Sequence, residues 1–319
     1  MTTYLITGIA GFIGSNIARA LLAQGASVRG VDSFITGKRM NLEDLYGIEF
    51  IEGTIEDPAT CARACRGVDF VFHEAALASV PRSVADPVSS NTANVTGTLN
   101  VLVAAREAGV RRVVYAGSSS AYGDQPTLPK HEEMIPNPIS PYAVSKLAGE
   151  HYMRSFSCVY GLETVTLRYF NVFGPHQDPS SQYSGVLAKF SLAMLNGSTP
   201  VIYGDGTQSR DFTFIENVVA ANLLAIAAPP ETVSGRVFNI ATGQRITLND
   251  AVTCLRELTG YTGPVSYKCA RTGDIAHSLA DISLARRALG YEPTVDFREG
   301  LRRALHWYSE HIAAKLAVA

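Results

Sequence analysis

The sequence lacks the residue patterns that are typical of disulfide-rich, metal-binding or membrane-anchored proteins. Its 319 residues include five cysteines, an odd number without a CxxC pair, so neither a disulfide framework nor a zinc ribbon is indicated. The seven histidines form no HxxxH or HExxH pair, and we expect no metal site. The densest apolar stretch, 218–228, contains Asn222 and is too short to span a bilayer, so we expect no membrane anchor.

An excess of charge of one sign is also missing. Lys and Arg number 27 against 29 Asp and Glu, which gives a net charge of −2, so we do not expect nucleic acid as a partner. A hydrophobic content of 46% with 18% charged residues predicts a folded chain rather than a disordered one. The N-terminus runs directly into a strand-like segment without an export signal, and we expect a cytoplasmic protein with reduced thiols.

The first half of the chain alternates β-branched, strand-like segments with helical ones, which is typical of a parallel α/β sheet. We predict strands at 3–7, 27–32, 48–52, 68–73, 112–117 and 162–168. We predict helices at 12–24, 58–66, 94–109 and 141–159. Asp57 and Asn94 are expected to begin the second and third of these helices. The predicted fold is therefore a Rossmann-type, doubly wound parallel sheet.

A second, smaller α/β lobe is expected after Arg168, where loops rich in Gly, Pro, Ser and Asp interrupt the alternation and shorter helices follow. The apolar helix at 215–228 and the strand-like segment 237–241 are predicted to return to the main sheet. We therefore expect a cofactor-binding domain of 1–168 plus 214–241. The substrate-binding C-terminal lobe, discontinuous in sequence, would comprise 169–213 plus 242–319.

A dinucleotide site is predicted at the first strand–helix turn, where Gly8, Gly11 and Gly14 give a GxxGxxG spacing. Glycines let the backbone approach a pyrophosphate at the helix N-terminus, although tight strand–helix packing alone explains the same pattern. Asp32 ends the second strand about 20 residues later, the spacing expected for a carboxylate that binds the adenosine ribose. This favours NAD, and the nearby Lys38 and Arg39 leave NADP as an alternative.

A proton-transfer site is predicted from Tyr142 and Lys146, which lie four residues apart and therefore share one helix face. A nearby ammonium favours the phenolate of Tyr142, which can then exchange a proton with a substrate hydroxyl. Ser118 and Ser119 follow the strand at 112–117, at the sheet edge where ligands bind, and can orient that transfer. Taken alone, the YxxxK spacing is common on helix surfaces and a serine-rich turn is common in loops.

Together these motifs resemble those of extended short-chain dehydrogenases/reductases of the nucleotide-sugar epimerase/dehydratase family. The resemblance covers nearly the whole chain through TGIAGFIG, HEAAL (73–77), SSSAYG, YAVSK, RYFNVFG (168–174), GDGTQSRDF (204–212) and GDIAHSLADIS (273–283). It implies an NAD cofactor, a UDP-sugar substrate and a homodimer formed through the helices at 94–109 and 141–159.

The resemblance also implies which residues contact the cofactor. They are Gly8, Gly11, Phe12, Ile13, Gly14, Asp32, Ser33, Thr36, Gly37, Thr54, Ile55, Ala75, Ala76, Leu77, Asn94, Tyr142, Lys146 and Phe170. Thr54 is a departure, because many relatives carry Gly-Asp-Ile where this chain has Gly53-Thr54-Ile55. Since Thr54 still offers a hydrogen bond, we expect altered adenine affinity rather than loss of NAD.

By the same resemblance, the catalytic residues are Ser118, Ser119, Tyr142 and Lys146, and a larger set holds the UDP-sugar. That set is Ala78, Ser79, Ser118, Ser119, Asn171, Gln177, Gly185, Val201, Tyr203, Arg210, Arg271, Asp274 and Ser278. Two arginines facing a diphosphate would make bidentate, charge-assisted contacts. Without the resemblance, a solvated surface position would be the simpler interpretation of both.

The family reaction implied for this chain is epimerisation at C4 of the sugar through a 4-ketosugar. Dehydratases of the family carry an Asp-Glu pair where this chain has Ser119 and Ser120, which favours epimerisation. Ser278 stands where relatives carry a large Tyr or a small Cys or Ser, and a small residue leaves room for an N-acetyl group.

The motifs are most similar to those of UDP-N-acetylglucosamine 4-epimerases, with UDP-glucose as a further candidate substrate. UDP-glucuronate 4-epimerisation is a less favoured alternative, because its enzymes usually carry Thr at the position of Asn171 and Arg near Asp178. A non-catalytic NAD-binding sensor or structural protein is the alternative from another class.

Overall fold

Seven parallel strands form the central sheet of the computed structural model, which describes residues 2–179, 185–270 and 275–313. The sheet order is β11-β6-β5-β4-β1-β2-β3. The strands are β1 (Thr3–Thr7), β2 (Ser27–Asp32), β3 (Glu49–Glu52), β4 (Phe70–His73), β5 (Arg112–Ser118), β6 (Glu163–Tyr169) and β11 (Arg236–Ile240). All pair in parallel, which confirms the predicted doubly wound sheet.

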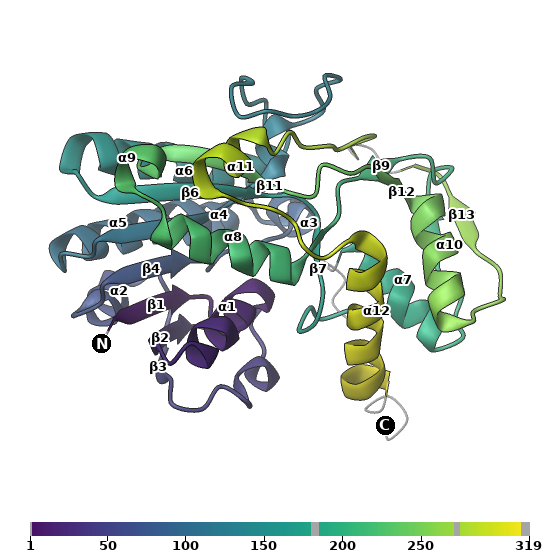
Figure 1. Cartoon of the computed structure of the whole chain (residues 1–319), viewed down its shortest axis with the longest axis horizontal. Coiled ribbons are helices and arrows are strands. Elements are labelled where there is room, and N and C mark those ends of the chain that lie inside the picture. Colours follow the sequence, from purple (N-terminus) through teal and green to yellow (C-terminus); the bar gives the residue numbers. More distant parts are fainter. Residues whose placement is uncertain (1, 180–184, 271–274, 314–319) are drawn as a thin grey trace.

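Helices cover both faces of this sheet. In Figure 1, α1 (Phe12–Ala23) and α8 (Ile215–Ala227) lie in front of it. The helices α2 (Pro58–Cys65), α5 (Gly97–Glu107) and α6 (Pro141–Tyr160) lie behind it. Leu5 and Ile6 of β1 enter opposite hydrophobic cores, as do Val113 and Val114 of β5. Because both faces are buried, the strands read as continuous apolar runs rather than as alternating ones.

The expected helix starts turned out differently at the two positions. The Asp57 carboxylate accepts hydrogen bonds from the backbone N–H groups of Ala59 and Thr60 at 3.1 and 3.0 Å, so Asp57 begins α2 as predicted. The prediction for Asn94 was wrong, because α4 (Pro87–Asn91) and the π-helical segment η2 (Thr92–Thr96) precede α5. Asn94 lies inside η2, and its side chain makes tertiary contacts instead of a cap.

The smaller lobe lies on the right in Figure 1 and contains α7 (Val186–Leu195), α10 (Leu248–Thr259) and α12 (Phe297–Tyr308). Three two-stranded sheets accompany these helices. They pair β7 (Val172–Phe173) with β10 (Thr213–Phe214), β8 (Val201–Tyr203) with β13 (Ser266–Lys268), and β9 (Ser209–Arg210) with β12 (Ile246–Thr247). The helices have ordinary lengths, whereas we expected short ones.

The chain returns to the main sheet after residue 213, as predicted, because α8 packs beside α1 and β11 pairs with β6. It also returns again later than expected. Helix α11 (Ser283–Leu289) contacts β11, and Tyr291 Oη donates a hydrogen bond to the Ala241 carbonyl at 2.9 Å. We therefore propose the predicted two-lobe division with one change, which is that α11 belongs with the sheet.

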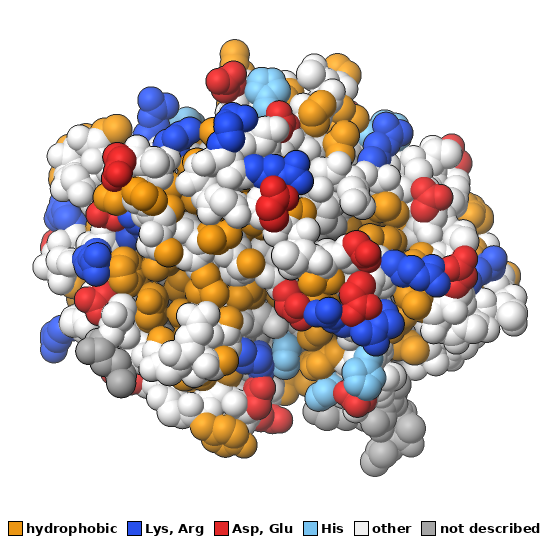
Figure 2. Space-filling model, viewed as in Figure 1, with side chains coloured by type: hydrophobic (Ala, Val, Ile, Leu, Met, Phe, Trp, Pro, Cys, Tyr) orange, Lys and Arg blue, Asp and Glu red, His pale blue; other side chains and the backbone are white. Residues whose placement is uncertain are grey.

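On the face shown in Figure 2, acidic and basic side chains are interspersed rather than separated. Arg302 and Arg303 form ion pairs with Glu299 on α12, and Arg303 also pairs with Glu216 on α8. Among the described residues, no helix is long and apolar enough to cross a membrane.

Candidate active site

The turn between β1 and α1 brings backbone to the edge of a deep cavity. Gly8 has a φ of +71°, and a Cβ at Gly14 would lie 2.4 Å from the Gly8 carbonyl oxygen, so both positions require glycine. β1 lies between β4 and β2 in the sheet, which makes this turn part of the switch point where ligands bind. We name the space beside it the cofactor cavity, lined among others by Gly8, Gly11, Asp32, Ala76 and Lys146.

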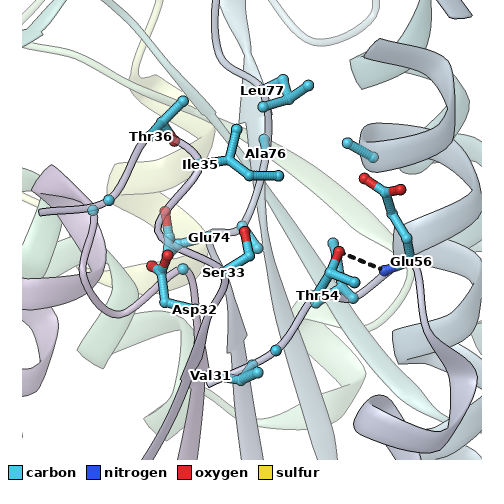
Figure 3. Close-up of a pocket in the computed structure, with 17 residues that line it drawn as sticks. Val31, Asp32, Ser33, Ile35, Thr36, Thr54, Glu56, Glu74, Ala76 and Leu77 are labelled. Carbon is cyan, nitrogen blue, oxygen red and sulfur yellow. Dashed lines mark hydrogen bonds between the residues drawn. The ribbon is translucent and has the colours of Figure 1, made fainter. Parts of the chain in front are cut away.

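The Asp32 side chain forms part of one wall of the cofactor cavity, together with Ser33 and Thr36 (Figure 3). Its oxygens accept hydrogen bonds from the backbone N–H groups of Ala10 and Phe34 at 2.9 and 2.8 Å. Burial raises the pKa of Asp32, and these two hydrogen bonds oppose that rise. The hydrogen bonds fix the carboxylate at the end of β2, where the sequence predicts a ribose contact.

Thr54 lies on the opposite wall in Figure 3, where its Oγ1 accepts a hydrogen bond from the Glu56 backbone N–H at 3.2 Å. The hydroxyl hydrogen of Thr54 can still be donated to a ligand, because a hydroxyl is both donor and acceptor. Ile55, which we also predicted to contact the cofactor, lines the same wall. The departure at Thr54 therefore leaves this side of the cavity intact.

The segment after β4 forms the third wall, and Asn94 holds it in place. Asn94 Oδ1 accepts a hydrogen bond from the Leu77 backbone N–H at 2.8 Å, and its Nδ2 donates one to Ser145 Oγ of α6 at 2.9 Å. Asn94 is 1% exposed, and these bonds tie the cavity wall to the helix that carries Tyr142. A direct contact of Asn94 with the cofactor stays a prediction.

Tyr142 lies where the cofactor cavity meets a second cavity, because its side chain lines both. Ser118, at the carboxyl end of β5, lines the second cavity together with Tyr142, and Ser118 Oγ lies 2.8 Å from Ser120 Oγ. Burial raises the pKa of Tyr142, while the Ser118 hydroxyl lowers it. The predicted Ser118 and Tyr142 are thus brought together.

Lys146, one helical turn after Tyr142, is buried at 3% exposure and points into the sheet edge. Its Nζ donates a hydrogen bond to the Ala116 carbonyl at 2.8 Å and lies 4.9 Å from the centre of the Tyr115 ring. Burial lowers the pKa of Lys146, and the negative charges of Glu74 and Glu150 oppose that fall. Lys146 and Tyr142 line the same cofactor cavity.

His73 lies on β4 next to this centre, and it is not suited to carry protons. It is fully buried, and its ring nitrogens contact Thr7 Oγ1 at 2.7 Å and Thr98 Oγ1 at 2.9 Å. Burial lowers its pKa to about 3, so the ring is neutral at physiological pH. Proton transfer by Tyr142 stays a prediction.

The second cavity, which we name the polar cavity, is bordered by side chains from both lobes. Its lining residues are Ala78, Ser118, Ser119, Ser120, Tyr122, Gly123, Lys130, Tyr142, Tyr169, Phe170, Asn171, Arg210, Ile275, His277 and Ser278. Ser278 is held there by β9, because its backbone N–H donates to the Ser209 carbonyl at 3.0 Å. Ser209 Oγ also lies 2.9 Å from His277 Nδ1.

A third cavity, which we name the outer cavity, adjoins the polar cavity through two residues that line both, Asn171 and Arg210. It also collects the predicted substrate residues Gln177, Gly185, Val201 and Tyr203. Ser79 lines the cofactor cavity, and Ala78 lines both the cofactor and the polar cavities. Arg271 and Asp274 lie outside the described residues.

The comparisons with known proteins agree with this geometry. The model of the NAD-dependent epimerase/dehydratase family matches residues 4–241. UDP-glucose 4-epimerase of Mycolicibacterium smegmatis is 38% identical over 309 residues, covering 95% of this chain and 97% of that protein. The chain belongs to the NAD-dependent epimerase/dehydratase family.

Solved structures of related epimerases superimpose closely on this family member. UDP-N-acetylglucosamine 4-epimerase from Methanobrevibacter ruminantium, in complex with UDP-N-acetylmuramic acid, has a TM-score of 0.92 at 39% identity and covers 98% of this chain and 99% of its own. UDP-glucose 4-epimerase of Thermus thermophilus, in complex with NAD, has a TM-score of 0.89 at 36% identity, covering 98% of this chain and 100% of its own.

The cofactor of this NAD-dependent epimerase/dehydratase is NAD, and the cofactor cavity fits it. Lys38 Nζ lies 3.3 Å from Asp178 Oδ2, and Arg39 pairs with Glu52 at 3.0 Å while stacking on the Phe34 ring. Lys38 and Arg39, which kept NADP as an alternative cofactor, are therefore both paired with carboxylates. Together with the Asp32 carboxylate, this arrangement disfavours a 2′-phosphate.

Several residues of the site were not predicted as contacts from the sequence. Glu74 lines the cofactor cavity, and Ser120, Lys130 and His277 line the polar cavity. Glu74 lies in HEAAL and His277 in GDIAHSLADIS, but the resemblance assigns contacts to other residues of these two motifs. Lys130 follows a proline in a long loop, and no spacing rule points to it.

Proposed function

We propose that the protein is an NAD-dependent 4-epimerase of UDP-hexoses, with UDP-N-acetylglucosamine and UDP-N-acetylgalactosamine as the favoured pair. The observation that carries this proposal is the position of Tyr142 at the junction of the cofactor and polar cavities. A sugar in the polar cavity would have its reacting carbon between the phenol and the cofactor. The activities of the related 4-epimerases support the same reaction class.

Tyr142 would take the proton of the sugar 4-hydroxyl and later return it to the 4-keto oxygen. Ser118 would orient that hydroxyl by a hydrogen bond, and the Lys146 ammonium would favour the phenolate. NAD, when bound, supplies a hydride acceptor that gives the hydride back. The proton and the hydride are both returned, so the reaction is an isomerisation without net oxidation.

The outer cavity would hold the nucleoside diphosphate while the keto sugar turns over. Arg210 borders both the polar and the outer cavities, which is the position expected for a cation that binds the diphosphate. Asn171 shares this border, and its Nδ2 donates a hydrogen bond to the Asp211 carbonyl at 3.2 Å. A fixed diphosphate with a free hexose would let the hydride return to either face.

Elimination of water is disfavoured, because the polar cavity offers Ser119 and Ser120 where dehydratases of the family carry an Asp-Glu pair. A serine hydroxyl is neither a competent acid nor a competent base at neutral pH. The keto sugar would therefore be reduced again rather than dehydrated.

The small side chain of Ser278, 9% exposed at the wall of the polar cavity, supports an acetamido sugar. It also admits the smaller UDP-glucose, which is the second candidate substrate. Asp178 is a carboxylate paired with Lys38, so this position offers no positive charge to the carboxylate of a uronate. Lys130 does place a cation in the polar cavity, which keeps UDP-glucuronate as a third candidate.

Proton NMR of UDP-N-acetylglucosamine with the purified protein and NAD tests the proposal. We expect the anomeric signal of UDP-N-acetylgalactosamine to grow to a constant ratio without net NADH. Conversion of UDP-glucose or UDP-glucuronate alone would keep the reaction and change the sugar. Silence with all three sugars, while NAD still binds, would contradict the epimerase proposal and favour a sensor.

A further inference from the structure

Glu74 is held in the cofactor cavity by a hydrogen-bond chain that crosses the sheet. Asn222 Nδ2 of α8 donates to Tyr169 Oη at 2.8 Å, and Tyr169 Oη donates to Glu74 Oε1 at 3.0 Å. Asn222 Nδ2 also donates to the Val218 carbonyl at 2.9 Å, and Asn222 Oδ1 lies 3.1 Å from Tyr169 Oη as a second acceptor for its hydroxyl hydrogen. Three separate elements, α8, β6 and the end of β4, therefore determine where the Glu74 carboxylate lies.

The second carboxylate oxygen of Glu74, Oε2, is shielded from solvent and has no hydrogen-bond partner within the described residues. A carboxylate oxygen without a partner in such a place costs free energy, unless a nearby positive charge or a bound ligand offsets it. Figure 3 shows Glu74 among the residues that line the cavity, and Lys146 lines the same cavity.

Two carboxylates, Glu74 and Glu150, interact electrostatically with Lys146. Of these two, only Glu150 also forms an ion pair with a second cation among the described residues. Glu150 accepts hydrogen bonds from the Arg168 guanidinium at 2.7, 3.0 and 3.1 Å, and both side chains are buried. The charge of Glu150 is therefore largely balanced by Arg168. Within the described part of the chain, Glu74 forms no ion pair at salt-bridge distance. Among the described residues, Glu74 is thus the carboxylate beside Lys146 that no other cation balances at salt-bridge distance.

We propose that Glu74 is a positioning residue that acts through Lys146. Its carboxylate keeps the buried ammonium protonated, so that Lys146 can stabilise the phenolate of Tyr142 at neutral pH. This inference rests on the proposed function, because it assigns a cause to the proton transfer at Tyr142. It adds a positioning residue to the proposed site.

The titration behaviour of the two groups agrees with this pairing. Burial raises the pKa of Glu74, and the Tyr169 hydrogen bond and the Lys146 charge oppose that rise. Burial lowers the pKa of Lys146, and Glu74 opposes that fall. The charged pair is therefore present above the pKa of Glu74 and is lost as pH rises through the pKa of Lys146.

Other charged and titratable groups near Glu74 come from several elements. Lys38 and Arg82 line the same cavity, as do Asp32 and Tyr142. Arg82 interacts with another group of the protein, and Lys38 forms an ion pair with Asp178. Tyr115 and Tyr169 have raised pKa values, burial being the main cause for each, so both are neutral phenols. His73 is neutral.

Glu74→Gln is the decisive variant, because it removes the charge and keeps the side-chain size. We expect the alkaline limb of the pH profile of kcat/KM to move down by about one pH unit, which is about a tenfold loss at the former limb. If kcat/KM fell equally at every pH and neither limb of the profile moved, Glu74 would have only a structural role, and the proposal would be overturned. Glu43→Gln removes an exposed carboxylate outside these cavities and should leave the profile unchanged.

A spectroscopic titration makes the test independent of turnover. The 13Cε resonance of Lys146 in lysine-labelled protein, identified by its absence from the Lys146→Met counterpart, reports ionisation of Lys146 with NAD bound. In the Glu74→Gln background we expect that ionisation at a pH about one unit lower, because the negative charge that opposes the fall in the pKa of Lys146 is gone. An unchanged titration overturns the inference, whatever sugar the enzyme accepts; absent turnover with a shifted titration sinks only the proposed function.

Tyr169→Phe provides a second route if Glu74→Gln does not fold. It removes the hydrogen bond to Glu74 Oε1 and keeps the charge. The pKa of Glu74 should rise further, so the acid limb of the profile moves to higher pH while the alkaline limb stays. An acid limb that does not move would contradict the chain from Tyr169 to Glu74 to Lys146.

Discussion

Lys38, in the segment after β2, pairs with Asp178 of the smaller lobe, with Nζ and Oδ2 3.3 Å apart. Both residues line the cofactor cavity, so the pair joins its two sides. Two further bonds run beside it, from Asn16 Nδ2 to the Pro175 carbonyl at 3.2 Å and from Asn41 Nδ2 to the His176 carbonyl at 3.4 Å. These three contacts, which we name the strap, hold the segment 175–178 beside the cofactor cavity.

Asp178→Asn should therefore speed the release of NAD. The side chains of Lys38 and Asp178 are 52% and 26% exposed, and such an ion pair is worth at most about 1 kcal/mol, so we expect up to a fivefold faster release. Stopped-flow fluorescence at low and high salt measures this rate. Salt should speed release from the unaltered protein and not from the variant.

Glu52→Gln is the matched control, because it breaks the ion pair of Glu52 with Arg39, which does not cross between the lobes. Its NAD release should equal that of the unaltered protein. If Asp178→Asn released NAD no faster than this control, the strap would have no part in retaining the cofactor.

Tyr142→Phe should abolish turnover while NAD still binds. Removing a proton-transfer group costs about 10²- to 10⁴-fold in rate, and Phe keeps the ring that borders both cavities. NMR of the sugar signals measures turnover, and the bound NAD is quantified after denaturation. Tyr46→Phe, at an 84% exposed tyrosine, serves as the control and should keep full activity. Substantial turnover by Tyr142→Phe would assign proton transfer to another group.

The main sheet could be predicted from the sequence because its signals are local. The β-branched runs at 3–7 and 27–32 match β1 and β2 residue for residue, and the predicted return of 237–241 matches β11 closely. Asn94 misled the prediction, because an Asn ahead of a helical run is typical of a cap, whereas here its amide joins Leu77 to Ser145. A contact with residues 17 and 51 positions away has no local signature.

The site divides in the same way. Gly8, Asp32, Tyr142 and Lys146 could be found because fixed spacings report their chemistry. Glu74 could not, because its importance comes from Tyr169, 95 residues away, and from an enclosed oxygen that only the folded cavity creates.

Ser278→Tyr should change which sugar is accepted. The larger side chain would fill the polar cavity where an N-acetyl group is expected, so turnover of UDP-N-acetylglucosamine should fall about 10- to 200-fold. UDP-glucose, which lacks the acetamido group, should still be turned over. A coupled assay with both sugars, and Ser278→Ala as the control that keeps the space, measures the ratio. Equal loss with both sugars, or unchanged turnover of both, would contradict the role of Ser278 in sugar size.

The family resemblance implies a homodimer through the helices at 94–109 and 141–159, and the candidate surface that the structure offers lies on α6, on the residues just before it and on α4 instead of 94–109. Val144, Val88 and Ile139 are 53%, 74% and 51% exposed and line one shallow groove there. Exposed apolar side chains gathered in one place favour burial against a partner, and a second copy of the chain would cover them.

Val144→Asp tests this surface, because a carboxylate at a buried apolar contact is costly, whereas the exposed position tolerates it in a monomer. Light scattering should give twice the 34.2 kDa chain mass for the unaltered protein and the single-chain mass for the variant. Tyr267→Asp, at a position that is also 53% exposed but lies on β13 in the smaller lobe, should remain dimeric. A dimeric Val144→Asp protein at the same concentration would place the interface elsewhere.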